Sequence, residues 1–100
     1  MSKDLIELSN PGEVLKEEFL DPLGISAYAL AKSIFVDPPR INEIIKGNRK
    51  ITADTALRLA HFFGTSPEFW MNMQSRYDIE KLREQKEKEF RKISRFHRAS

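Results

Sequence analysis

The sequence has 100 residues and a net charge of +2, from 17 basic and 15 acidic side chains. A chain of this length forms one small domain around a single core, so we do not expect a large enzyme. Cysteine is absent, which removes disulfides, thiol catalysis and cysteine zinc sites, and no apolar run approaches the roughly 18 residues of a membrane span. The N-terminus lacks the basic and apolar regions of a secretory signal, so a cytoplasmic protein is expected.

The first predicted helix covers residues 11–20. Asn10 before Pro11, with an acidic residue three positions after Asn10, is the pattern of an N-cap, a first-position proline and a capping box. Pro22 and Gly24 are expected to end this helix. Three of its apolar side chains are expected to face the core: Val14, Leu15 and Phe19.

Two short helices follow, separated by only three or four residues. Ser26 is expected to cap the first, which runs to about Ser33, and Asp37 to cap the second, which ends at Gly47. Helical spacing gives each a buried face, formed by Leu30, Ala31 and Ile34 and by Ile41, Ile44 and Ile45. These lengths are typical of a helix-turn-helix, whose second helix enters the DNA major groove.

The last two predicted helices complete an all-α chain of five helices. Thr52 caps the fourth, which runs to Phe63 before Gly64 and turns Leu57, Ala60 and Phe63 inward. Ser66 caps the fifth, and no residue after it ends that helix before the chain end. We therefore divide the chain into a DNA-binding domain, residues 1–80, and a charged helical extension, residues 81–100. The extension is interpreted as a dimer arm, a partner-binding helix or a frayed end.

Positive charge is concentrated in two parts of the chain. Residues 1–23 carry two basic and six acidic side chains (−4), residues 24–75 six and four (+2), and residues 76–100 nine and five (+4). A local basic cluster lies within residues 40–50: Arg40, Lys46, Arg49 and Lys50, against Glu43 alone. Because phosphate attraction decays within about 8–10 Å at physiological salt, such a cluster matters more than the total charge.

The polar side of the second short helix carries residue types that read DNA bases. Arginine pairs with guanine, asparagine with adenine and glutamate with the cytosine amino group. The candidates are Arg40, Asn42, Glu43 and Lys46. The following loop, with Asn48, Arg49 and Lys50, leads to Thr52 at a helix N-terminus and suits phosphate contacts. A solvated charged face, with Asn48 serving only the turn, is the alternative interpretation.

Two segments resemble the HigA-type antitoxins, which are also known as virulence-associated protein I and belong to the Xre/Cro-like helix-turn-helix group. They are NPGEVLKEEFLDPLGISAYALAKSI and RINEIIKGNRKITADTALRLAHFFGTSPEFWMNMQSRYDI, together covering roughly residues 9–80. The resemblance implies a lambda-repressor-like fold and a homodimer that binds a palindromic operator in its own promoter. It also implies a cognate toxin, usually a RelE-like mRNA endonuclease, that the antitoxin neutralises.

The resemblance assigns roles to individual residues. It places Arg40, Asn42 and Glu43 at bases, with Lys46 close behind, and matches Asn48, Arg49, Lys50 and Thr52 to a phosphate-contacting loop. It also matches Ser26, Tyr28 and Lys32 to the first helix of the motif, whose N-terminus normally lies against the DNA backbone.

Two residues depart from the family pattern. Ala27 replaces a common glutamine, which predicts the loss of one DNA contact. Phe35 stands before Val36, where a glycine is frequent. A bulky residue is strained at positive φ, so an alternative turn conformation that tilts the second helix is predicted.

Other functions fit the residues less well. Phe62, Phe63, Phe69 and Trp70 have helical spacing that favours a core or a dimer seam over a ligand site. His61 and His97 lack metal-ligand spacing, no activated nucleophile or glycine-rich loop is present, and neither an enzyme nor a cofactor is expected. The alternatives are a helix-turn-helix regulator without a toxin, a protein-interaction module and, more weakly, RNA binding through the basic tail.

Overall fold

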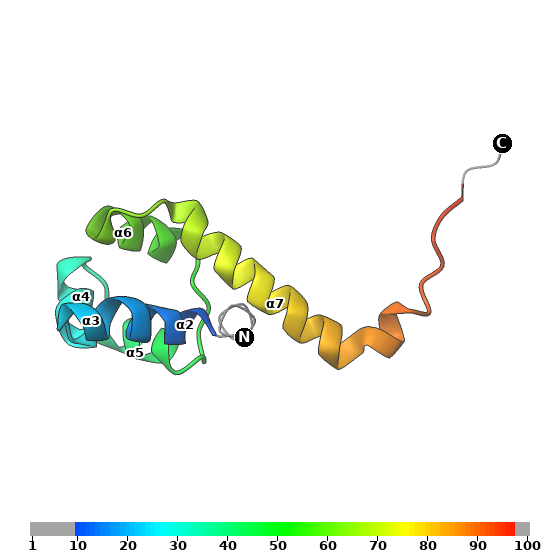
Figure 1. Ribbon diagram of the computed structural model, residues 1–100, viewed down its shortest axis with the longest axis horizontal. Helices are drawn as coiled ribbons and strands as arrows, with labels where there is room; N and C mark the ends of the chain where they lie inside the picture. Colours follow the sequence, from blue (N-terminus) through cyan, green and yellow to red (C-terminus); the bar gives the residue numbers. More distant parts are fainter. Residues whose placement is uncertain (1–9, 98–100) are drawn as a thin grey trace.

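The computed structural model describes residues 10–97, in which every regular element is a helix (Figure 1). In chain order these are α2 (Pro11–Val14), the π-helical segment η1 (Leu15–Leu20), α3 (Asp21–Leu23), α4 (Ala27–Ser33), α5 (Pro38–Ile45), α6 (Ala53–Phe63) and α7 (Pro67–Phe90). The segments α2, η1 and α3 follow one another without a break and form one helix. The described residues therefore contain five helices, as the sequence predicts.

The first helix begins where it was predicted to begin but ends later. The Asn10 side chain accepts a hydrogen bond from the Gly12 amide at 2.6 Å, which confirms the N-cap. The helix continues through Pro22 and ends at Gly24, in the left-handed conformation at φ 66°. The prediction that Pro22 ends the helix is wrong. In η1 the Asp21 amide bonds to the carbonyl of Lys16, five residues back, and this wider turn leaves room for the proline ring.

Side-chain caps fix the start of three other helices. The hydroxyls of Ser26, Thr52 and Ser66 each accept a backbone N–H from three residues further on, at 3.0, 3.5 and 3.1 Å. These three predicted caps are confirmed. Asp37 occupies the N-cap position of α5 with extended backbone, yet its side chain accepts no capping hydrogen bond. The position of the helix start was thus predicted correctly, whereas its stabilisation by the Asp37 side chain was not.

A single hydrophobic core lies between α2–α3 and α4–α7. Trp70 is fully buried, and its indole N–H donates to the Thr65 hydroxyl at 2.8 Å. The Phe19 ring packs 4.9 Å from both Phe63 and Trp70, which confirms these two predicted residues as core. Phe62 and Phe69 are 39% and 42% exposed and are not core residues, so the dimer seam stays a prediction for them. The prediction for Leu57 is wrong, because this side chain is 50% exposed. The buried arc of α6 is instead centred on Thr55, Ala56, Leu59 and Ala60.

Helix α7 gives the molecule its elongated shape (Figure 1). The described chain measures 58 × 28 × 22 Å, because α7 runs out of the core and every residue of it from Lys81 is exposed. The helix bends at Lys86, which has φ −124°, and ends at Phe90. The prediction of a helix to the chain end is wrong for residues 91–97, since no tertiary packing supports them, and residues 98–100 lie outside the described part. Within residues 10–97 no helix has the length and apolar character to cross a membrane.

Candidate nucleic-acid interface

The helix-turn-helix is formed by α4, a turn at residues 34–37, and α5. Phe35 adopts the left-handed conformation at φ 58°, and the Val36 amide donates to the Ala31 carbonyl at 3.0 Å. Arg58 of α6 donates to the Ile34 carbonyl at 2.8 Å and holds the turn from outside. The predicted alternative turn is therefore not observed. The turn keeps positive φ, and the phenyl side chain is 85% exposed beside it.

Helix α5 divides its side chains between core and solvent. Ile41 and Ile44 are buried and Ile45 is half-buried, as predicted. On the opposite side Asn42 and Lys46 are exposed. An α-helix turns by about 100° per residue, so these positions form one arc that points away from the domain.

Arg40 lies at the edge of this arc, against the start of α6. Its Nη1 atom donates to Oδ2 of Asp54 at 3.0 Å, and Nε of Arg58 donates to the same oxygen at 2.9 Å. The hydrogen bonds from Arg58 and then Arg40 hold the pKa of the Asp54 carboxyl below its ordinary value. Arg40, a predicted base reader, is thus held by a carboxylate on the next helix.

Glu43 is also engaged, by the loop that follows α5. The Asn48 side-chain amide donates to Glu43 Oε1 at 3.0 Å, and the Lys46 ammonium lies 3.9 Å from Glu43 Oε2. The backbone N–H of Asn48 also donates a hydrogen bond to the Glu43 carbonyl at 2.9 Å. Asn48 therefore closes the loop onto α5, the turn role that the sequence left open for it.

Two contacts with α7 hold the loop from Lys46 to Thr52. Lys50 pairs with Asp78 of α7 at 3.3 Å, and the Ile51 amide donates to the buried Gln74 side chain at 2.9 Å. Arg49 is exposed, and Thr52 caps α6. These contacts fix the position of the loop, which carries basic side chains and leads into the N-terminus of α6.

The start of the first helix holds the end of α5. A Cβ atom at Gly12 would overlap the Ile44 carbonyl oxygen and lie 2.8 Å from the Ile45 Cα atom. Only glycine permits this close approach of the two backbones. Gly12 thereby sets the position of α5 relative to the rest of the domain.

The three predicted positions on the first motif helix are spread along it, from the N-cap Ser26 to Lys32 in the last turn of α4. The Ser26 hydroxyl is occupied as the α4 cap. Tyr28 is 61% exposed, and the Lys32 ammonium lies 5.9 Å from the centre of its ring. Ala27 is half-buried. The side chains of Tyr28 and Lys32 thus lie next to each other on the solvent-exposed side of α4.

Sequence reasoning missed three residues that support this surface: Asp54, Arg58 and Gln74. Asp54 and Arg58 are four residues apart on a predicted helix, a spacing typical of ion pairs that could have indicated them. Their further contacts with Arg40 and with the turn depend on tertiary structure. Gln74 carries no such signal, because a single glutamine in a helix is ordinarily a surface residue.

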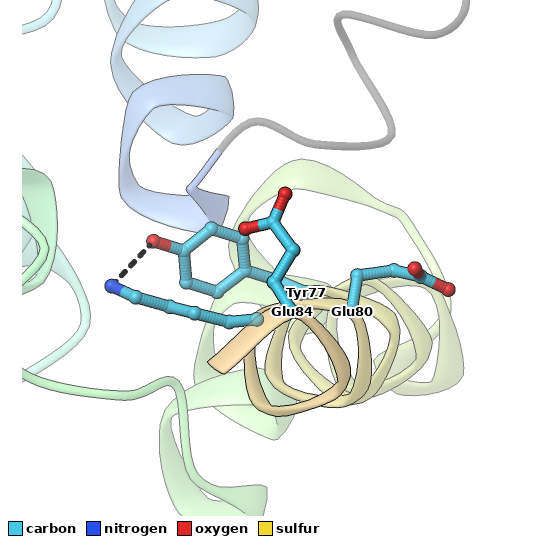
Figure 2. Close-up of a pocket in the computed structure, with 4 residues that line it drawn as sticks. Tyr77, Glu80 and Glu84 are labelled. Atoms are coloured by element: carbon cyan, nitrogen blue, oxygen red, sulfur yellow. Dashed lines mark hydrogen bonds between the residues drawn. The ribbon is translucent and has the colours of Figure 1, made fainter. Parts of the chain in front are cut away.

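A pocket on α7 lies outside this surface (Figure 2). Tyr77, Glu80, Lys81 and Glu84 line it, and the Lys81 ammonium donates to the Tyr77 hydroxyl at 3.3 Å. Among residues 10–97 no group of three His, Asp or Glu side chains is arranged to hold a metal ion.

Comparison with known proteins agrees with this geometry. The helix-turn-helix family matches residues 15–70. Virulence-associated protein I of Dichelobacter nodosus is 53% identical over 78 residues, covering 78% of this chain and 72% of the relative. Antitoxin HigA-1 of Vibrio cholerae serotype O1 is 43% identical over 68 residues, covering 68% of this chain and 64% of that protein.

A solved structure extends the similarity to the fold. The Pseudomonas aeruginosa antitoxin HigA, solved with the higBA promoter, has a TM-score of 0.86 and 38% identity, covering 90% of this chain and 99% of that one. The chain belongs to the helix-turn-helix family, within the group of HigA-type antitoxins and virulence-associated protein I.

Proposed function

We propose that the protein is a cytoplasmic antitoxin that binds a palindromic operator as a homodimer and represses its own operon. The exposed arc of α5, beside the pinned basic loop, is the observation that carries the DNA-binding part. An α-helix fits the major groove, and the residue types on this arc match base edges. A two-fold dimer would place two α5 helices about 34–36 Å apart, one helical turn of DNA.

Base reading and phosphate binding are assigned to different residues in this proposal. Arg40, Asn42, Glu43 and Lys46 read bases; Asn48, Arg49, Lys50 and Thr52 contact phosphates, and Ser26, Tyr28 and Lys32 lie against the backbone. Glu43 and Arg40 have intramolecular partners in the free protein, so DNA must share or replace these bonds. Residues 1–80 form the DNA-binding domain, and residues 81–100 are an extension available to a partner.

Operator binding is tested by fluorescence anisotropy with two duplexes, the DNA upstream of the protein's own gene and a shuffled version. At near-physiological salt with competitor DNA, a preference of about 10³-fold or more for the upstream duplex supports the proposal. Saturation at one dimer per site is expected. Equal, weak binding to both duplexes would contradict it and favour the protein-interaction module.

The two residue classes are separated by a pair of substitutions. Arg40→Ala should cost about 1–3 kcal/mol of specific binding and relax discrimination at one base position. Lys50→Ala should weaken binding to every duplex alike and reduce the salt dependence by about one phosphate contact. Identical behaviour of the two variants would contradict the division of roles.

The toxin partner is proposed from the names of the relatives, which include an antitoxin HigA-1. A RelE-like mRNA endonuclease encoded beside the gene is the expected partner. Induction of that neighbouring reading frame should stop growth, and co-expression of this protein should restore it. Growth arrest that this protein does not relieve would favour a helix-turn-helix regulator without a toxin.

A further inference from the structure

The Asp54 carboxylate lies where the turn, α5 and α6 meet. One of its oxygens, Oδ2, accepts hydrogen bonds from two guanidinium groups, Arg40 Nη1 at 3.0 Å and Arg58 Nε at 2.9 Å. Arg58 is itself bonded to the Ile34 carbonyl at 2.8 Å. Arg58 therefore fixes Asp54 against the turn, and Asp54 in turn holds Arg40.

Only one edge of the Arg40 guanidinium is used by this contact. The group has five N–H donors in a planar fork, and Asp54 takes a hydrogen bond from Nη1. A bidentate contact with guanine needs two parallel donors of such a fork. The Arg40 side chain is 29% exposed, and among residues 10–97 its guanidinium has no side-chain acceptor besides Asp54, so its other donors remain available.

We propose that Asp54 is a positioning residue for base reading by Arg40. It restrains a long, flexible side chain in one orientation, so that less conformational freedom is lost when the remaining donors meet a guanine. This inference rests on the proposed operator binding. Asp54 itself touches no base in this scheme and acts through Arg40.

The charge of Asp54 makes the proposal distinguishable from a purely structural role. A carboxylate near the DNA-binding side opposes the attraction of phosphates, so its removal should raise affinity for any DNA, by about two-fold for a charge roughly 8–10 Å away. Loss of the restraint on Arg40 should instead lower discrimination between bases. A variant that is merely destabilised would lose both kinds of binding together.

The experiment compares wild type, Asp54→Ala, Arg40→Ala and the double variant. Each selects from a pool of duplexes with a randomised core, and anisotropy then measures binding to the recovered duplex, to single-base changes in it and to a shuffled duplex. Asp54→Ala should lower discrimination at one guanine, at most by the full worth of a bidentate contact, which is about 5- to 150-fold. Binding to the shuffled duplex should be equal or tighter.

Asp37→Ala is the matched control, since it removes an exposed carboxylate at the start of α5 that makes no capping hydrogen bond. It should leave discrimination unchanged. In the Arg40→Ala background, Asp54→Ala should cause no further loss of discrimination.

Each other result overturns the inference. A further loss in the Arg40→Ala background would show that Asp54 acts through the fold. Tighter, equally selective binding by Asp54→Ala would show that the carboxylate only competes with DNA for Arg40. Wild type that selects no sequence would overturn operator binding and this inference together, whereas selective wild type with equally selective Asp54→Ala overturns this inference alone.

Discussion

Phe35 is the residue whose replacement tests the geometry of the turn most directly. It holds φ at 58° while 85% of the residue is exposed, so its side chain contributes little packing. The left-handed conformation lowers the free energy of unfolding by about 1–2 kcal/mol for a residue with a Cβ atom. Glycine avoids this strain, but its greater freedom in the unfolded chain lowers the free energy of unfolding by about 0.4–1 kcal/mol. We therefore expect Phe35→Gly to be more stable than Phe35→Ala by about 0.5–1 kcal/mol.

Urea unfolding, followed by circular dichroism and by the fluorescence of the single tryptophan, Trp70, measures this difference. The control is Ala29→Gly in α4, where the ordinary order holds and glycine should be less stable by about 1 kcal/mol. The sign of the glycine–alanine difference should thus reverse between positions 29 and 35. If Phe35→Ala proves the more stable of the two, the left-handed turn is refuted. Operator binding should survive Phe35→Gly, since the turn already has the conformation that glycine favours.

Three further predictions concern contacts around the proposed interface. Gly12→Ala should destabilise the protein by about 2–3 kcal/mol and weaken DNA binding, because the new methyl group meets the backbone of α5. The control Gly24→Ala has open space around it and should cost only about 1 kcal/mol and leave DNA binding unchanged. Equal losses of stability in urea unfolding would contradict this prediction. Gln74→Leu should cost about 1–3 kcal/mol in the same assay by leaving the buried Ile51 amide unpaired, and an unchanged midpoint would contradict it. Folding lowers the pKa of the Asp54 carboxyl from 3.8, so this carboxylate stabilises the fold above pH 3.8 and loses its contribution as the pH falls through its folded-state pKa. The difference in urea midpoint between wild type and Asp54→Asn should therefore be constant above about pH 5 and shrink below about pH 4. A difference that is constant at every pH would contradict the lowered pKa of Asp54.

Local chemistry determined the helices of this protein. Ser26, Thr52 and Ser66 were predicted as caps because a hydroxyl three residues before a free N–H is a local arrangement, independent of the rest of the fold. The glycine stop at Gly64 and the buried isoleucines of α5 follow equally from short-range pattern. The candidate site could be predicted to the same extent, as a polar arc on one helix beside a basic loop.

Predictions failed where a neighbouring element outweighed the local preference. Pro22 stays inside the first helix because the π-helical segment before it widens the turn, and periodicity does not reveal such a segment. The residue pattern of α6 predicts that Leu57 faces the core, but Leu57 is exposed. Which side of α6 is covered depends on its packing partners, and the pattern does not contain them. The absence of stop signals predicts a helix to the chain end, yet α7 ends at Phe90, where no packing against the core supports further turns.

The sequence by itself determined that the chain is all-α, that its second and third helices form a helix-turn-helix, and which polar residues lie on the outer side of α5. These depend on residues within a few positions of one another. Tertiary structure alone decided that Arg40 is held by Asp54, that Arg58 supports the turn at Phe35, and that Gln74 pins the basic loop. Those contacts join residues 14 to 24 positions apart, and their geometry is set by how the helices pack, which no local pattern encodes.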